Sequence, residues 1–233
     1  MRVAAAADLR FALDDLVRRF EPDREGIDVE VSYGSSGTFY AQLLNQAPFD
    51  MFLSADIEYP RRLADRGMTL PGSAFTYAVG RLVIWARASS TVHIEDTGLR
   101  ALGAAAVKHV AIANPEHAPY GRAAVAAMRT ADVYEAVRPK LVYGENVEQA
   151  LQFAQSGAAD VGIVALSLAL APSVRSRGRY VEVPLTMYPH IVQGGAILRW
   201  VRDADATWTF RAFLVSDRGR AILKEYGFSL PGD

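Results

Sequence analysis

The feature that most constrains the fold of this chain is a short apolar run followed by a small loop and an amphipathic helix, a pattern that repeats. Near the N-terminus, runs at residues 3–7, 26–33 and 50–55 each precede apolar residues at helical spacing. Strands that alternate with helices favour a mainly parallel, doubly wound sheet. The sequence therefore predicts an α/β fold.

The pattern changes twice along the chain, near residues 80 and 188. Between these points a second set of strands is expected at residues 82–86, 110–113, 141–143, 161–164 and 181–183. After residue 188 we expect one strand within 191–198 and two helices, at 208–214 and 219–226, that pack on the first domain. The prediction is two doubly wound α/β domains, residues 1–80 with 189–233 and residues 81–188, joined by two crossover strands. Ligands of open α/β sheets bind at the carboxyl ends of strands, so a ligand cleft is expected between the domains.

One loop, residues 34–38 (Gly-Ser-Ser-Gly-Thr), joins a predicted strand to a predicted helix. The first turn of a helix has backbone N–H groups without internal partners, and the helix dipole is positive there. Glycines allow an anion to approach the backbone, and serine hydroxyls add donors, so the loop suits an oxyanion. It is not a P-loop, since the Gly-Lys-Ser/Thr ending is missing. An ordinary turn with a serine N-cap is the alternative.

Four strand-to-helix turns share this character: Ala7-Asp8, Ser35-Ser36, Tyr120-Gly121 and Asn146-Val147. The first two belong to the first domain and the last two to the second. Several helix N-termini facing one small site would bind an oxyanion with neutral donors. Each residue also has a plain interpretation: Asp8 and Ser36 as helix caps, Tyr120 as a packed aromatic, and Val147 as a donor through its backbone N–H alone.

Three charged residues lie beside these turns. Arg10 and Arg122 could contact an anion, although a solvated surface position is the plainer interpretation. Asp56 follows a predicted strand and could brace the site, or it could simply cap the next helix.

Composition excludes several classes of function. The 233 residues carry a net charge of −1, so no overall basic field favours nucleic acid or anionic lipid. The chain has no Cys, which excludes disulfides and thiolate metal sites, and its four His lack zinc-binding spacing. No apolar run is long enough to span a bilayer. Met1 leads almost directly into a strand, as in a mature exported domain or a cytosolic protein.

Taken together, seven segments resemble the family of periplasmic molybdate-binding proteins of bacterial ABC importers. They are residues 4–9, 34–38, 47–56, 114–121, 144–147, 156–164 and 188–189, in the family's order along nearly the whole chain. The resemblance implies the type II periplasmic binding protein fold and no catalysis. It also implies a monomeric periplasmic protein that needs no cofactor, holds molybdate or tungstate between its domains, and delivers it to an inner-membrane permease.

The family's binding positions correspond here to Ala7, Asp8, Ser36, Tyr120 and Val147. These residues are expected to hold the oxyanion through its oxygens, without direct metal ligands. Many family members have a tyrosine directly after the strand at 161–164. This chain has Ala165 there, and Tyr120 is expected to substitute.

Asp8 departs from the family, which usually has Ser, Thr or Asn at this position. A carboxylate about 4 Å from a unit anion costs roughly 4 kcal/mol at an effective dielectric constant near 20, and more against a dianion. Three interpretations are open. Asp8 turns away and caps its own helix, leaving its backbone N–H to the ligand; it is protonated and donates its O–H; or the ligand is not molybdate.

Other functions compete with this one. The same fold could bind sulfate, phosphate or another anion. A serine-dependent transferase would use Ser36 as nucleophile and His117 as base, but the Gly-x-Ser-x-Gly elbow is missing. The effector-sensing half of a transcription regulator would need a separate DNA-binding chain, since no such segment precedes Met1.

Overall fold

The computed structural model describes residues 1–23 and 26–230. The chain divides into two units, Met1–Gly80 with Val192–Asp233 (unit 1) and Arg81–Ile191 (unit 2). The first boundary lies where the sequence predicts it, and the second lies after Ile191 instead of after residue 188. The N-terminal segment and the two closing helices share unit 1.

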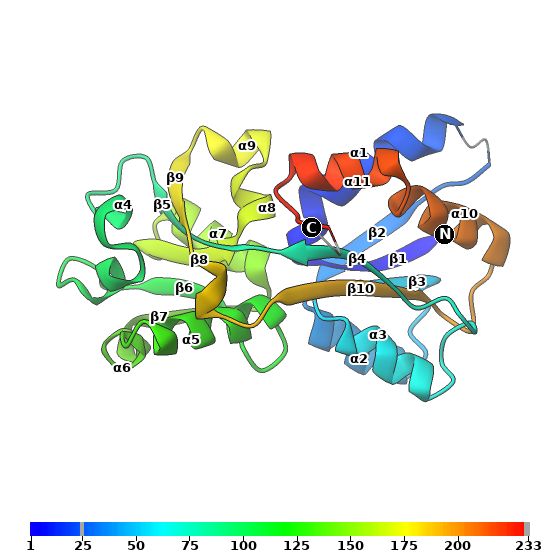
Figure 1. Ribbon diagram of the computed structural model, residues 1–233, viewed down its shortest axis with the longest axis horizontal. Coiled ribbons are helices and arrows are strands. Elements are labelled where there is room, and N and C mark those ends of the chain that lie inside the picture. Colours follow the sequence, from blue (N-terminus) through cyan, green and yellow to red (C-terminus); the bar gives the residue numbers. More distant parts are fainter. Residues whose placement is uncertain (24–25, 231–233) are drawn as a thin grey trace. The chain divides into compact units, whose positions relative to one another are not determined.

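Unit 1 contains a five-stranded sheet with the strand order β2-β1-β3-β10-β4 (Figure 1). β1 runs parallel to β2 and β3, whereas β10 runs antiparallel to β3. The predicted parallel sheet is therefore correct for the first three strands, and the returning strand adds an antiparallel neighbour. The strands are β1 (Arg2–Ala6), β2 (Glu30–Gly34), β3 (Met51–Ser54), β4 (Phe75–Gly80) and β10 (Ile191–Ile197).

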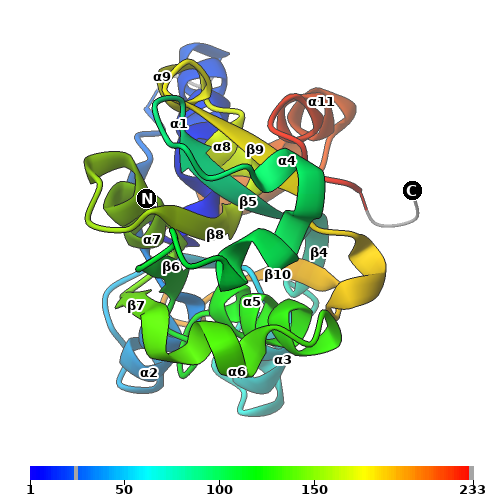
Figure 2. The ribbon, with the colours of Figure 1, turned by 90° about the vertical axis from the view of Figure 1, so that its left-hand side faces the viewer.

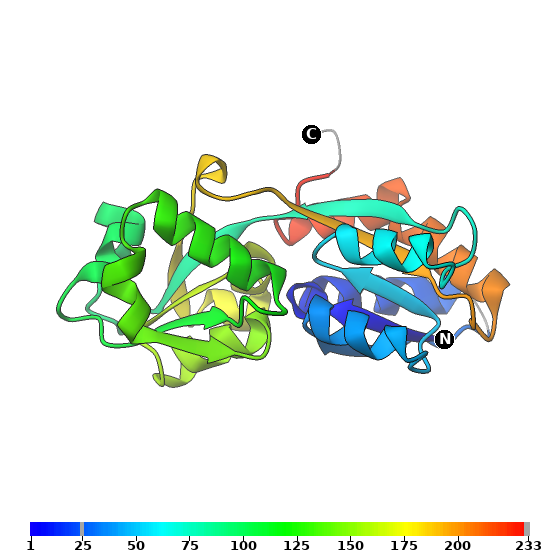
Figure 3. The same ribbon diagram turned by 90° about the horizontal axis from the view of Figure 1, so that it is seen from below.

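Helices cover both faces of this sheet. Figure 1 shows α1, α10 and α11 on one face and α2 and α3 on the other, and Figure 3 shows α2 and α3 side by side. The helices are η1 (Ala7–Leu9), α1 (Arg10–Phe20), η2 (Glu21–Asp23), α2 (Ser36–Leu44), α3 (Glu58–Asp65), α10 (Ala204–Leu214) and α11 (Asp217–Glu225).

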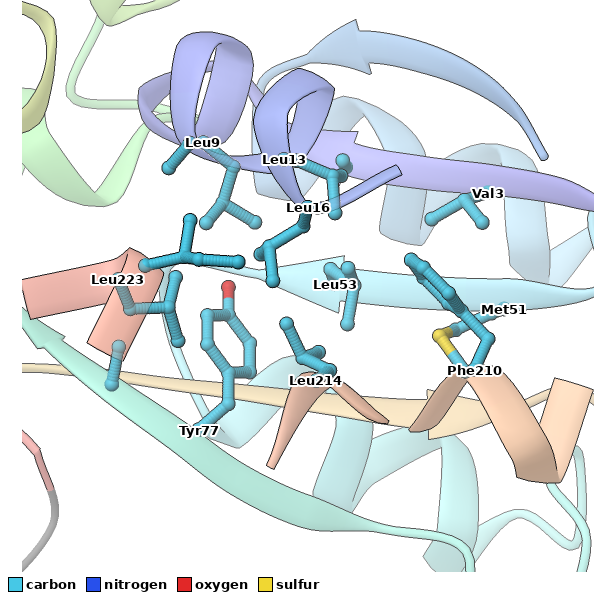
Figure 4. Packing of buried hydrophobic residues seen from close by; sticks show 14 of the residues in the cluster. Val3, Leu9, Leu13, Leu16, Met51, Leu53, Tyr77, Phe210, Leu214 and Leu223 are labelled. Carbon is cyan, nitrogen blue, oxygen red and sulfur yellow. The ribbon is translucent and has the colours of Figure 1, made fainter. Parts of the chain in front are cut away.

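Alternate strand residues supply two hydrophobic layers, one on each side of the sheet. Val3 and Leu53 pack with residues of α1, α10 and α11, including Phe210 (Figure 4). Ala4 and Phe52 pack on the opposite face with residues of α2 and α3. This two-sided burial explains why the strands read as continuous apolar runs. The two closing helices pack on the first domain, as predicted.

Unit 2 repeats the architecture with the strand order β7-β6-β8-β5-β9, which can be followed in Figure 2. β6 runs parallel to β7 and β8, and β5 runs antiparallel to β8 and β9. The strands are β5 (Leu82–Arg87), β6 (Val110–Ala113), β7 (Leu141–Gly144), β8 (Val161–Ala165) and β9 (Gly178–Glu182). The helices are α4 (Ile94–Thr97), η3 (Gly98–Gly103), α5 (Pro119–Thr130), α6 (Tyr134–Val137), η4 (Arg138–Lys140), α7 (Val147–Ser156), α8 (Leu166–Ala169), α9 (Pro172–Arg175) and η5 (Leu185–Met187).

Several strand boundaries differ from the predicted ones; β9, for example, covers Gly178–Glu182 where residues 181–183 are predicted. β1 ends at Ala6 because Ala7 already belongs to η1. β2 begins at Glu30 instead of residue 26, because its pairing with β1 starts at the pair formed by Arg2 and Glu30.

Candidate functional site

The carboxyl ends of the three parallel strands of unit 1 lie at one edge of its sheet. Ala6 of β1 pairs with Gly34 of β2, and Ala5 pairs with Leu53 of β3. η1, α2 and the loop before α3 begin directly after these strands. The three candidate residues of unit 1, Ala7, Asp8 and Ser36, are therefore brought to the same edge.

Ser35 and Ser36 have different roles at the start of α2. Ser35 is the N-cap, and its Oγ accepts a hydrogen bond from the backbone N–H of Thr38 at 3.3 Å. Ser36 is the first helical residue, is 1% exposed, and accepts a hydrogen bond from the N–H of Ala55 at 3.0 Å. In the described part of the chain, the hydroxyl hydrogen of Ser36 has no acceptor. The Ser36 hydroxyl can therefore still donate a hydrogen bond, and the prediction of a capping role for it is wrong, since Ser35 is the N-cap.

Asp8 is not a helix N-cap, which corrects the plain interpretation. It lies inside η1, and neither η1 nor α1 has a side-chain hydrogen bond at its N-cap. Its carboxylate instead accepts a hydrogen bond from Nε2 of Gln193 on β10, at 2.5 Å. This partner is 185 positions away in the sequence, so no local pattern could indicate it.

A buried polar network continues from Gln193 across the sheet. The hydroxyl of Tyr77 on β4 lies 2.9 Å from Oε1 of Gln193 and 3.0 Å from the carbonyl oxygen of Ser54 at the end of β3. Burial raises the pKa of the Tyr77 phenol well above its usual range, and the charge of Asp8 raises this pKa further. Tyr77 therefore remains a hydrogen-bond donor at neutral pH. No sequence motif selects Tyr77 or Gln193; the one signal is that they are polar residues within apolar strands.

Unit 2 presents a second set of helix starts at the carboxyl ends of parallel strands. Ala113 of β6 pairs with Gly144 of β7, and α5 and α7 follow these strands. Tyr120 and Val147 lie in the first turns of α5 and α7, and both are buried. Asn146 caps α7 by accepting a hydrogen bond from the N–H of Gln149 at 3.0 Å.

Two glycines allow these helix starts to lie close to the strand ends. A Cβ on Gly121 would lie 2.1 Å from the carbonyl oxygen of Ala113, and one on Gly144 would lie 2.7 Å from the backbone nitrogen of Ala150. Both contacts are with backbone atoms, so neither can be relieved by rotating a side chain. The first turn of α5 and the turn before α7 therefore depend on glycine.

His117 connects the two loops of unit 2. Its Nε2 lies 3.0 Å from the carbonyl oxygen of Glu145 and 3.5 Å from the Glu145 carboxylate. The described contacts of Ser36 and His117 are thus with Ala55 and Glu145.

The remaining candidates have local roles. The guanidinium of Arg10 lies 4.9 Å from the centre of the Tyr33 ring, and Arg122 is partly exposed in the first turn of α5. Asp56 precedes Ile57, the N-cap of α3, and its carboxylate accepts a hydrogen bond from the N–H of Glu58 at 3.0 Å. Ala165, the last residue of β8, is fully buried.

Within residues 1–23 and 26–230, no group of three or more His, Asp or Glu side chains is placed to hold a metal ion. No helix among these residues is both long and apolar enough to cross a membrane. The structure thus brings together Ala7, Asp8 and Ser36 in unit 1, and Tyr120 and Val147 in unit 2. Their joint contact with one ligand, and the predicted cleft, stay predictions.

Comparison with known proteins places the chain in a family. Residues 1–229 match the family model described as bacterial extracellular solute-binding protein. The molybdate-binding protein ModA of Azotobacter vinelandii is 38% identical over 230 residues, covering 99% of this chain and 90% of the relative. ModA of Rhodobacter capsulatus is 38% identical over 206 residues, covering 88% of this chain and 79% of the relative.

A solved structure agrees with this assignment. The periplasmic molybdate-binding protein of Azotobacter vinelandii superposes with a TM-score of 0.90 at 33% identity, covering 99% of both chains. The chain therefore belongs to the family of bacterial extracellular solute-binding proteins.

Proposed function

We propose that this protein is the molybdate-binding component of an ABC importer, that it also binds tungstate, and that it passes the anion to a membrane permease. The single observation that carries the proposal is the geometry of Ser36. Its oxygen accepts a hydrogen bond from the N–H of Ala55, which holds that oxygen at the start of α2 and leaves the hydroxyl hydrogen to donate to a ligand. A neutral donor at a helix N-terminus suits an oxyanion. The similarity to the two ModA proteins selects molybdate among such anions.

The proposed ligand set contains residues of both units. Ala7 and Asp8 contribute backbone N–H groups, Ser36 its hydroxyl, Tyr120 its side chain or backbone N–H, and Val147 its backbone N–H. These groups bind the oxygens of the anion, and the metal atom has no protein ligand. Neutral donors in fixed positions favour one oxygen spacing, which is how such a site separates anions by size.

In this proposal the protein works in the periplasm as a monomer, needs no cofactor, and catalyses no reaction, since the anion is its cargo. Sulfate or phosphate as the true ligand is the competing possibility within the same fold.

Thermal unfolding of the ligand-free protein with molybdate, tungstate, sulfate and phosphate tests the proposal. A ligand at about 100 times its Kd adds roughly 2.7 kcal/mol to the free energy of unfolding. At about 2–4 °C per kcal/mol for a chain of this size, Tm should rise by about 5–10 °C. We expect this shift with molybdate and tungstate and none with sulfate or phosphate.

Two variants complete the experiment. Ser36→Ala removes the hydroxyl donor, and a hydrogen bond to a charged group contributes about 1.5–3 kcal/mol, so most of the molybdate shift should disappear. Ser89→Ala, at an exposed position of unit 2, is the matched control and should keep the full shift. A shift with sulfate or phosphate alone would move the function to that anion. No shift with any of the four would overturn the oxyanion proposal.

A further inference from the structure

Gln193 is fully buried at the beginning of β10, at 0% exposure. Its neighbour Gly194 pairs with Ser54, the last residue of β3. Gln193 therefore lies level with the loop that leaves β3, at the same edge of the sheet as the candidate anion site. Its side chain lies on the same face of the sheet as that of Ile197, because alternate residues along β10 point to the same face. A buried amide at this position needs hydrogen-bond partners.

The partners of Gln193 fix the orientation of its amide group. A carboxylate only accepts hydrogen bonds, so the NH₂ group faces Asp8. The carbonyl oxygen then faces the Tyr77 hydroxyl, which can donate to it. The hydrogen bonds thus run in one direction, from Tyr77 through Gln193 to Asp8. Asp8 is thus the final acceptor of this series, and all three residues belong to unit 1.

We propose that Gln193 is a positioning residue that sets the affinity for the anion by holding the Asp8 carboxylate against β10. Held in this way, Asp8 presents its backbone N–H to the anion and keeps its negative charge away from it. This inference rests on the proposed function, and it explains how a carboxylate is tolerated where the family usually has a neutral donor. Without the Gln193 amide, the carboxylate loses the donor that holds it against β10, and its charge is less strongly kept from the dianion.

A double-mutant cycle in the full chain, with molybdate binding measured by titration calorimetry, tests this role. Gln193→Leu should weaken binding by about ten-fold or more, as expected for losing a hydrogen bond to a charged group. In an Asp8→Asn background, where no carboxylate is present, the same change should alter Kd by less than about three-fold. An equal loss in both backgrounds, or no loss in the wild-type background, would overturn the proposal.

A second test exchanges the hydrogen-bond donor and acceptor between Gln193 and Asp8. It does not place an apolar side chain at position 193, as Gln193→Leu does. Gln193→Glu places two carboxylates side by side and should weaken binding by about ten-fold or more. Adding Asp8→Asn restores a hydrogen bond of reversed direction and should return Kd to within about three-fold of wild type. If the double variant binds molybdate no better than Gln193→Glu alone, the positioning role of Gln193 is contradicted.

Controls separate this inference from loss of structure and from failure of the proposed function. Thr207, whose hydroxyl donates to the Asp203 carbonyl oxygen at 2.6 Å, is another fully buried polar residue of unit 1. Thr207→Val should lower the Tm of the ligand-free protein without changing Kd. Wild-type protein that binds no molybdate would refute the proposed function itself, whereas wild-type binding without coupling between Gln193 and Asp8 would refute only this inference.

Discussion

Asp8 and Asp50 show that the role of a carboxylate in this protein is decided by its hydrogen-bond donors. Asp8 has an amide donor from β10, at the edge where the candidate site lies. Asp50 precedes β3 at the other end of that strand, and it accepts from the backbone N–H of Arg2 and from the backbone and guanidinium of Arg202. One carboxylate is placed to affect function, and the other ties the start of β1 to the loop after β10.

Asp50 should make a measurable contribution to stability at neutral pH. Burial alone would raise its pKa, but the hydrogen bonds and charge of Arg202 and the bond from Arg2 outweigh burial and lower the pKa from 3.8 to about 2. Because the folded-state pKa is depressed, the stabilisation is present above pH 4 and is lost as the pH falls toward 2. Asp50→Asn should therefore lower the free energy of unfolding by about 1–2 kcal/mol at pH 7.

Urea unfolding of wild type and Asp50→Asn between pH 2 and pH 7 measures this contribution. The difference between the two proteins should be constant above about pH 5 and shrink as the pH falls below 4. Asp65→Asn, an exposed position in α3, serves as the control and should change stability by less than about 0.5 kcal/mol. A difference between wild type and Asp50→Asn that stays constant down to pH 2 would contradict the assigned pKa.

At the scale of elements, locally encoded features were predictable from the sequence and long-range ones were not. α7 begins at Val147 as predicted, because Asn146 caps it from the adjacent position. β6 covers Val110–Ala113 as predicted, because a continuous apolar run is the signature of a strand buried on both faces. The N-cap of α2 is Ser35, whose Oγ accepts from the N–H of Thr38, whereas Ser36 accepts from Ala55 of another loop, a partner that the local sequence does not indicate. The side chain of Asp8 could not be assigned, because its partner lies on the returning strand.

The close approach of α5 to the end of β6 leads to a prediction about Gly121. Alanine in a helix is favoured over glycine by about 1 kcal/mol, so Gly121→Ala would stabilise α5 if there were room. The Cβ would lie 2.1 Å from the carbonyl oxygen of Ala113, however, and the start of α5 would have to move. We expect a net destabilisation of about 1–3 kcal/mol and weaker molybdate binding, because Tyr120 moves with the first turn.

Urea unfolding and calorimetric titration of Gly121→Ala check this expectation. Gly103→Ala is the matched control in the same unit, since a Cβ there meets no atom within 4 Å. Its effect on stability should stay below about 0.5 kcal/mol, with unchanged binding. Equal effects of the two substitutions would show that the space beside Gly121 does not determine the position of α5.

For the whole molecule, the order of motifs along the chain was more informative than any single motif. The turn at Ser35-Ser36 alone is compatible with an ordinary helix start, and Ser35 does act as one. Unit 2 has its own sheet, and its turns at Tyr120 and Asn146 also follow the carboxyl ends of parallel strands. Because each unit presents helix N-termini at strand ends, we predict that both units contribute to binding one ligand. The side-chain contacts of Asp8 with Gln193 and of Ser36 with Ala55 could not be predicted, because each joins positions that are not adjacent in the sequence.

Hydrogen–deuterium exchange measured with and without molybdate tests the participation of both units. Backbone N–H groups that bind an anion, and helix turns that it orders, exchange more slowly. We expect slower exchange in residues 7–10 and 36–40 of unit 1 and in residues 119–123 and 147–150 of unit 2. α6 (Tyr134–Val137) contains none of the proposed ligand residues and should exchange at the same rate in both samples. Protection confined to unit 1 would remove Tyr120 and Val147 from the ligand set while leaving Ser36 in it. Protection in both units is the result expected if Ser36 of unit 1 and Tyr120 of unit 2 belong to one ligand set, as proposed.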